Sequence, residues 1–84
     1  MADERRIGRI THYFSRAGVG IIELNEGDLK VGDTIRIKGK HTDFTQTVQS
    51  MQIEHKDVTQ AEKGKVVGIK VNERVREHDE VFVL

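Results

Sequence analysis

The chain has 84 residues, equal numbers of basic and acidic side chains (14 each), and no cysteine or proline. The balanced charge argues against general attraction to nucleic acid or to an anionic membrane, and the lack of cysteine excludes disulfides and thiolate metal sites. A chain of this length has room for one core. We therefore expect a single domain over residues 1–84, with residues 1–5 as a flexible tail.

The composition favours β-strands over helices. Val and Ile far outnumber Leu and Ala, and β-branched side chains fit a pleated surface better than a helix. The charged amino terminus is not followed by the apolar segment of a secretory signal, and no apolar run is long enough to span a bilayer. We expect an all-β, cytoplasmic protein that does not interact with membranes.

The amino-terminal half predicts three strands. Residues 6–14 form the first, and their apolar positions change parity around Gly8, which indicates a bulge. A Gly-containing turn leads into residues 19–24, so the first two strands form a hairpin. After a second turn, residues 34–38 alternate between apolar and basic side chains and predict a half-buried third strand.

The carboxy-terminal half predicts three more strands. Residues 44–54 form the fourth, and a bulge near Gln49 would reconcile its two sets of apolar positions. The connection that follows can include one helical turn, and residues 65–71 and 80–84 form the fifth and sixth strands. Six short strands with Gly-rich turns predict a closed, six-stranded antiparallel β-barrel, because closure removes exposed sheet edges.

No catalytic or metal-binding motif is recognisable. The four histidines are dispersed, and none has a His or Cys neighbour at the spacing of a zinc site. No Ser, Thr or Cys is marked as a nucleophile by a turn motif. The phosphate-binding loop G-x-x-x-x-G-K-[ST] is also missing from the sequence. We expect no enzyme activity, no nucleotide hydrolysis, no cofactor and no metal.

Basic side chains on the third strand form the candidate binding site. Arg36, Lys38 and Lys40 alternate along one face, with His41 adjacent, and this arrangement suits contact with a phosphate backbone. The alternative is a solvated outer face without a partner. Arg9, on the first strand, joins this basic stripe if the fold brings the two strands together.

Other features bear less directly on RNA binding. Further basic groups occur at the start of the first strand and around Gly64, namely Arg5, Arg6, Lys63 and Lys65. Aromatic side chains that could stack on bases are scarce. We expect Phe14 and Phe82 to lie in the core and Tyr13 to be partly exposed.

An ordered set of glycine, apolar and acidic positions runs through residues 7–83, and its most telling members are Gly8, Gly27, Asp28, Gly32, Val48, Met51, Gly64, Gly68, Val75 and Asp79. This set resembles the second domain of translational GTPases of the elongation factor type. The resemblance implies a six-stranded barrel which, in the intact factors, packs beside a GTPase domain and helps to hold the aminoacyl end of tRNA. Gln52 and Val66 occupy the family's acidic and Asn positions near the terminal adenosine, and they lack the carboxylate and the amide of that pocket.

Another set of positions consists of residues 44–48 with Met51, Ala61, Val71, Val75 and Asp79. This set resembles the small carboxy-terminal barrel of the U32 family of peptidase-like proteins, and the resemblance implies an accessory module for an enzyme encoded elsewhere. Our leading hypothesis is a non-enzymatic barrel that binds RNA or the ribosome weakly through the basic stripe. The alternative is a protein-interaction module that docks on a U32-like enzyme or on a GTPase.

Overall fold

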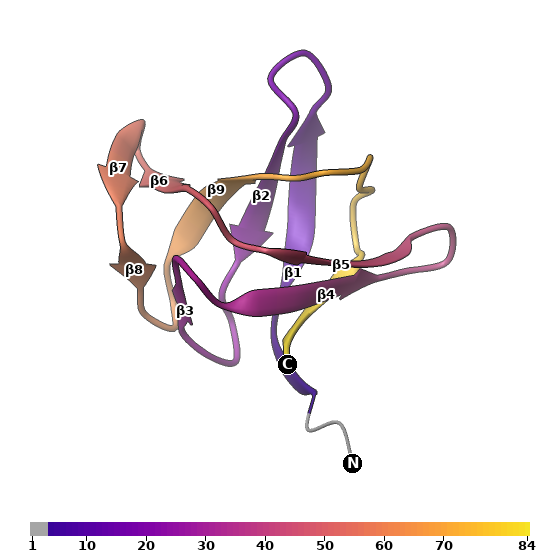
Figure 1. Ribbon diagram of the computed structural model, residues 1–84, viewed down its shortest axis with the longest axis horizontal. Coiled ribbons are helices and arrows are strands. Elements are labelled where there is room, and N and C mark those ends of the chain that lie inside the picture. Colours follow the sequence, from indigo (N-terminus) through magenta and orange to yellow (C-terminus); the bar gives the residue numbers. More distant parts are fainter. Residues whose placement is uncertain (1–3) are drawn as a thin grey trace.

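The computed structural model describes residues 4–84, which form ten β-strands and no helix. The strands are β1 (Arg5–Phe14), β2 (Val19–Glu23), β3 (Leu29–Lys30), β4 (Thr34–Lys38), β5 (Asp43–Thr47), β6 (Met51–Ile53), β7 (Lys56–Val58), β8 (Gln60–Ala61), β9 (Val66–Lys70) and β10 (Glu80–Val83). Eight of them form one sheet in the order β5-β4-β10-β1-β2-β9-β6-β7, and β3 pairs with β8 in a second sheet. Figure 1 shows the β1–β2 hairpin crossed by the β4–β5 hairpin.

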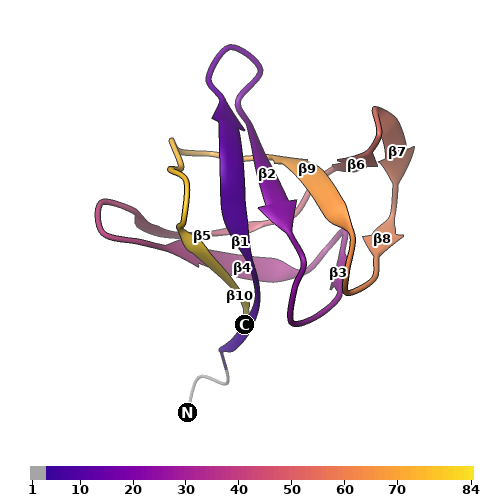
Figure 2. The same cartoon turned by 180° about the vertical axis from the view of Figure 1, so that it is seen from behind.

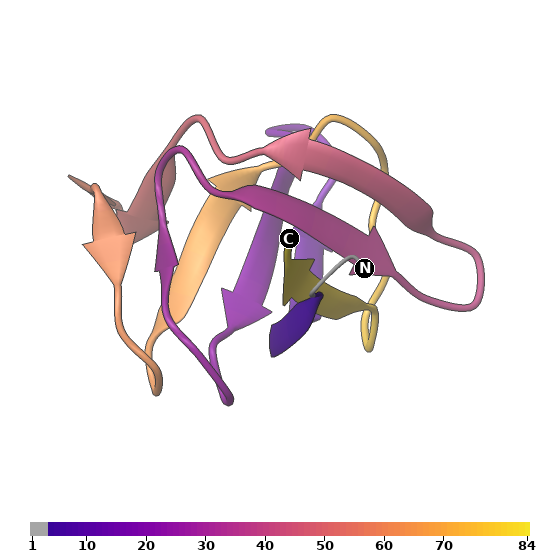
Figure 3. The same cartoon turned by 60° about the horizontal axis from the view of Figure 1, so that its bottom comes forward.

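The all-β prediction is confirmed, but the prediction of a closed six-stranded barrel is wrong. The outermost strands of the large sheet, β5 and β7, do not pair with each other, so the sheet curls into an open half-barrel. The chain itself crosses the open side, because β5 and β6 follow one another in sequence while β5 pairs with β4 and β6 pairs with β9. The view in Figure 3 shows this segment running across the top of the molecule.

Gln46 on β5 fastens this open side. Its side chain is buried, with 6% exposure. Its Nε2 donates a hydrogen bond to the carbonyl oxygen of Lys70 at 2.8 Å, and its Oε1 accepts one from the backbone N–H of Asn72 at 2.7 Å. Next along the chain, the backbone N–H of Val48 donates to the carbonyl oxygen of Asp33 at 2.9 Å. The edge of β5 that lacks a strand neighbour is therefore tied to the end of β9.

The core fills the inside of the half-barrel. On β4, for example, Ile35 and Ile37 are buried while Arg36 and Lys38 face outward, as the alternation of a strand requires. The buried apolar side chains form one cluster, which consists of Ile7, Ile10, Ile22, Leu24, Leu29, Ile35, Ile37, Phe44, Val48, Met51, Ala61, Val67, Ile69, Val71, Val75 and Val81. Every strand except β7 contributes to it, so the small chain has one continuous core.

The predicted bulge at Gly8 is confirmed. The register of β1 against β10 shifts between Arg6 and Gly8, and a Cβ at Gly8 would overlap the backbone of Glu23 on β2. Only a glycine allows this close approach of β2.

A second irregularity in β1 was not predicted. The register against β2 shifts between Ile10 and His12, and this shift changes the parity of the strand. Tyr13 consequently packs against the core and Phe14 points outward, with 50% exposure. The prediction of Phe14 as a core residue is wrong for this reason. Phe82 also lies outside the buried cluster, because it pairs with outward-facing Arg36.

Other segments differ from the predicted elements. The fourth predicted strand, residues 44–54, is divided into β5 and β6 by residues 48–50, and the predicted fifth strand is preceded by β7 and β8 rather than by a helical turn. Residues 1–3 of the expected tail lie outside the described residues. Arg5 opens β1 and pairs with Val83, which brings the two ends of the described chain together (Figure 1). No helix that could cross a membrane is found in residues 4–84.

The Gln46 contacts give a first prediction. Replacing Gln46 by Leu should lower the free energy of unfolding by about 1–3 kcal/mol, because the carbonyl of Lys70 and the N–H of Asn72 lose their partner. Thr45→Ala, on the exposed face of the same strand, is the control and should change stability by less than about 0.5 kcal/mol. Urea denaturation of both variants measures the difference, and equal stabilities would contradict the assigned role of Gln46.

Candidate functional site

The predicted basic stripe lies on the β4–β5 hairpin, and its first member is neutralised. The Arg36 guanidinium donates from Nε and Nη2 to the two carboxylate oxygens of Asp43, both at 2.8 Å, and from Nη1 to Glu4 at 2.8 Å. These bonds raise the pKa of Arg36 above its usual range and hold the pKa of Asp43 below its ordinary value of 3.8. Arg36 therefore has two carboxylate partners within the chain.

Lys38 and Arg9 have acidic neighbours on the adjacent strands. The strand register places Asp43, Lys38, Glu80, Arg9 and Glu23 next to one another across five neighbouring strands, in a row of alternating sign. The fold does bring Arg9 near the stripe, but β10 and its Glu80 lie between, and Arg9 forms an ion pair with Glu23 at 3.4 Å. Cross-strand pairs of opposite charge stabilise a sheet and reduce the local positive potential.

The turn of the hairpin keeps its positive charge. Lys40 and His41 are exposed there, and neither they nor Lys38 forms an ion pair within residues 4–84. Arg6, from the second basic group, is bound to Glu26 and lies 3.3 Å from Glu80. None of these contacts tests whether the stripe binds RNA, so RNA binding stays a prediction.

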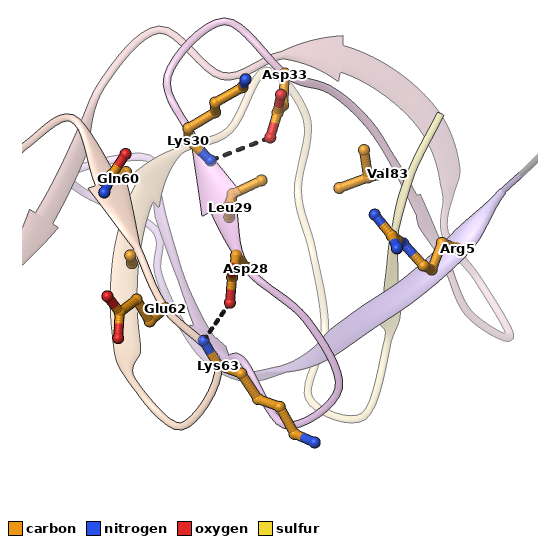
Figure 4. Close-up of a pocket in the computed structure, with 10 residues that line it drawn as sticks. Arg5, Asp28, Leu29, Lys30, Asp33, Gln60, Glu62, Lys63 and Val83 are labelled. Atoms are coloured by element: carbon orange, nitrogen blue, oxygen red, sulfur yellow. Dashed lines mark hydrogen bonds between the residues drawn. The ribbon is translucent and has the colours of Figure 1, made fainter.

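A polar cavity of about 570 Å³ lies between the small β3–β8 sheet and the paired ends of β1 and β10 (Figure 4). Two of its three carboxylates already accept backbone hydrogen bonds: Asp28 from the N–H of Lys63 at 2.7 Å, and Asp33 from the N–H of Lys30 at 3.1 Å. Figure 4 shows Arg5 pointing into the cavity, whereas the Lys63 ammonium points away from it. The carboxylates hold the turns in place, and we assign no ligand to this cavity.

Sequence reasoning missed an apolar groove on the outer face of β2, β9 and β6, beside the end of β1. Figure 2 shows β1, β2 and β9 side by side in the foreground. The groove has a volume of about 610 Å³ and is lined by Phe14, Arg16, Ala17, Val19, Ile21, Gln52, Glu54, His55, Val66, Val67 and Gly68. Phe14 and Val66 are each 50% exposed, although both are large and apolar. An exposed apolar surface of this kind marks a binding site more often than an isolated exposed residue does.

Two signals in the sequence pointed toward the groove. The first is alternation: Val66 precedes the inward-facing Val67 of β9 and so faces outward. The second is the resemblance to the elongation-factor domain, which places Gln52 and Val66 at the positions of that family's binding pocket. The structure brings both residues to one groove. Phe14 carried no such signal, because its outward orientation depends on the unpredicted bulge in β1.

One end of the groove is formed by a strained turn. Glu54 and His55 connect β6 to β7 with φ angles of 50° and 65°, in the left-handed region that two-residue hairpin turns require. Gly and Asn adopt this conformation easily, whereas other side chains do so at a cost of about 1–3 kcal/mol each. Both side chains line the groove. Strain of this kind is concentrated at functional sites.

No group of three or more His, Cys, Asp or Glu side chains that could hold a metal ion occurs within residues 4–84. Nor does the groove contain a paired nucleophile and base: its polar residues are Arg16, Gln52, Glu54 and His55. An apolar floor with single polar groups at its edge is typical of a surface that binds an apolar ligand or side chain.

Comparison with known proteins gives a family match and two curated relatives. The family model of elongation factor Tu domain 2 matches residues 18–83. An uncharacterized protease of Methanocaldococcus jannaschii is 51% identical over 79 residues, which are 93% of this chain and 19% of that protein. A collagenase of Porphyromonas gingivalis is 38% identical over 77 residues, 90% of this chain and 21% of that protein. The chain thus spans about a fifth of the length of these curated relatives.

A solved structure agrees with these matches. The crystal structure of the C-terminal domain of a Geobacillus thermoleovorans protein assigned to the U32 peptidases superposes with a TM-score of 0.86. The alignment covers 96% of this chain and 92% of that chain at 18% identity, so it shows a shared fold. Both resemblances expected from the sequence are confirmed.

The Arg36–Asp43 pair predicts a pH effect. The pKa of Asp43 is lowered by its hydrogen bonds to Arg36, so the unfolded chain takes up the proton at a higher pH than the folded chain does. The stability that the pair supplies is fully present above pH 3.8 and is lost as the pH falls through the lowered pKa. Asp43→Asn should therefore lower the thermal midpoint at pH 6 and have little effect at the acid end of the titration.

Thermal scans between pH 2 and pH 6 measure this difference. In an Arg36→Met background, Asp43→Asn should have a smaller effect at pH 6, because the partner of the carboxylate is already gone. An equal change of the thermal midpoint in both backgrounds would show that the Asp43 carboxylate does not stabilise the fold through Arg36.

Proposed function

The chain belongs to the elongation factor Tu domain 2 family, and on that premise we propose that it is a non-catalytic interaction module for the catalytic part of a U32-type protein. The observation that carries this proposal is the exposed apolar groove beside Phe14 and Val66. Apolar surface of this kind favours a protein partner, whose contacts depend on buried apolar side chains. The 51% identity to an uncharacterized protease of M. jannaschii, together with the shared fold of the C-terminal domain of a protein assigned to the U32 peptidases, supports a U32-type partner over a GTPase.

The balance of charge supports the same proposal. RNA binding requires several uncompensated cations, whereas Arg36 and Arg9 are paired with carboxylates in this chain. The groove itself contains one arginine and one glutamate, Arg16 and Glu54, so it offers no net positive charge to a phosphate backbone. The expected location of the module is the cytoplasm, as the sequence predicts.

Capture of the partner tests this function. The tagged chain is used as bait in native lysate that has been divided into nuclease-treated and untreated halves, and bound proteins are identified by mass spectrometry. We expect one stoichiometric protein with a U32-type sequence, and its recovery should survive nuclease. Recovery of RNA or ribosomal proteins alone, lost on nuclease treatment, would contradict the proposal.

The second candidate function is weak binding of RNA. It is favoured by one observation, the cluster of Lys38, Lys40 and His41 at the end of the β4–β5 hairpin without ion-pair partners in the described chain. Flexible exposed lysines suit sequence-independent contacts with phosphates. Arg9 and Arg36 would contribute to such a site if RNA displaced their carboxylate partners.

The RNA function predicts that Lys38→Glu with Lys40→Glu abolishes retention of RNA in a chain that stays folded, although its thermal midpoint falls because the new carboxylate at position 38 lies between Asp43 and Glu80. Lys63→Glu with Lys65→Glu makes the same change of net charge away from the hairpin and is the matched control. Filter binding of total RNA at two salt concentrations measures the effect. Equal retention by the two double variants would exclude the hairpin as an RNA site.

A further inference from the structure

The apolar groove is polar at both ends, and the two ends carry opposite charge. Arg16 stands in the turn that joins β1 to β2, and Glu54 stands in the turn that joins β6 to β7. The antiparallel register of β6 and β9 places Glu54 on the side of Val66, whereas the β1–β2 turn lies beyond Val19 and its partner Lys70. Neither Arg16 nor Glu54 forms an ion pair within the described residues.

The floor of the groove is formed by a glycine that the backbone does not require. Gly68 lies opposite Ile21 on β2 and opposite Gln52 on β6, and its φ lies outside the left-handed region. A Cβ at this position would stand 3.3 Å from Cγ1 of Val19 and 3.4 Å from Cδ1 of Ile21, so a side chain would fill the groove. A strand glycine of this kind marks a close approach by another backbone or ligand.

One hydrogen-bonding group is available beside this floor. Gln52 donates from Nε2 to Asp57 at 3.0 Å, which fixes the orientation of its amide, and its Oε1 accepts no hydrogen bond within residues 4–84. An oriented carbonyl oxygen beside a glycine can accept a hydrogen bond from the backbone N–H of an extended segment.

We propose that this groove binds a short extended peptide segment of the partner protein. The segment has a large apolar side chain that sits over Gly68 between Phe14 and Val66, an acidic residue facing Arg16, and a basic residue facing Glu54. The inference rests on the proposed function, because it names the surface through which the module recognises its partner. Charge complementarity at the two ends selects the segment and sets its direction along the groove.

A nucleic acid fits these features less well than a peptide does. The groove has a single arginine, Arg16, and a carboxylate, Glu54, at its other end, so an extended phosphate backbone would meet repulsion at the Glu54 end. The carboxylate and amide that the family pocket uses are replaced by Gln52 and Val66, and Val66 offers no hydrogen bond to a base.

The test is a titration of the ¹⁵N-labelled chain with two acetylated and amidated peptides, Asp-Thr-Phe-Thr-Lys and Lys-Thr-Phe-Thr-Asp, followed by NMR. We expect saturable shifts of the Gln52 and Gly68 amides with both peptides, and tighter binding of one charge order than of the other. Replacing the central Phe by Ala in the preferred peptide should weaken binding about tenfold or more, because the apolar contact is lost.

Variants of the chain separate binding in the groove from other effects. Val66→Glu should weaken binding of the preferred peptide about tenfold or more, whereas Val31→Glu, at a valine exposed elsewhere, should leave it unchanged. The double variant Arg16→Glu with Glu54→Arg should reverse the preference between the two charge orders. Thermal midpoints of all variants establish that they are folded.

Four results would overturn the inference. They are the absence of saturable groove shifts at millimolar peptide, equal binding of both charge orders, an unchanged preference in the charge-reversed double variant, and tighter binding of adenosine monophosphate than of either peptide. The proposed function fails separately: peptide binding without capture of a U32-type partner rejects the function alone. Capture of that partner with unchanged efficiency by the Val66→Glu variant rejects the groove as the recognition site and leaves the function standing.

Discussion

The fold depends on how a small sheet closes around its core without a continuous ladder of strand pairs. The two outermost strands of the eight-stranded sheet do not meet, and the segment from β5 to β6 crosses the open side as a single length of chain. Gln46 makes the crossing possible, because one amide satisfies both the carbonyl of Lys70 and the N–H of Asn72 from a buried position. Val48 and Met51 can then both point inward from the two sides of the break. A buried side-chain amide replaces the backbone pairs that a closed barrel would have.

The outer surface of the sheet has two faces, one charged and one apolar. The face of β5, β4, β10 and β1 is covered by cross-strand pairs of opposite charge, in which Arg36 is held by Asp43 and Glu4. The face of β2, β9 and β6 is apolar and contains the groove, with Gly68 at its floor. The charged face has internal ion-pair partners for several of its side chains, whereas beside the apolar face Phe14 and Val66 each stay 50% exposed, although the Phe14 ring packs edge-on against His12. The exposed apolar surface is the one that a partner can cover, and this difference is the reason why we propose a protein rather than an RNA as the first candidate partner.

Much of the fold followed from the sequence because alternation and glycine placement have direct structural consequences. The β1–β2 hairpin, the bulge at Gly8 and the half-buried β4 were all predicted from these patterns. The closure was not predictable, because a buried Gln that bonds to the backbone of a distant strand has the same local pattern as an exposed one. The groove was missed because Phe14 faces outward only as a result of the register shift after Ile10, and that shift depends on pairing with β2. The basic stripe lies on β4 and the turn that follows it, but the sequence could not show that the neighbours of Lys38 across the sheet are acidic.

The central claim is that the apolar face, and not the charged hairpin, meets the partner. Hydroxyl-radical footprinting of the chain, free and in its captured native complex, tests it most directly, since the method reports the solvent exposure of individual side chains by mass spectrometry. The account predicts that oxidation of Phe14 and His55 falls in the complex, while oxidation of His41 and Phe82 is unchanged. Protection of His41 and Phe82 with continued exposure of Phe14 and His55 would contradict it.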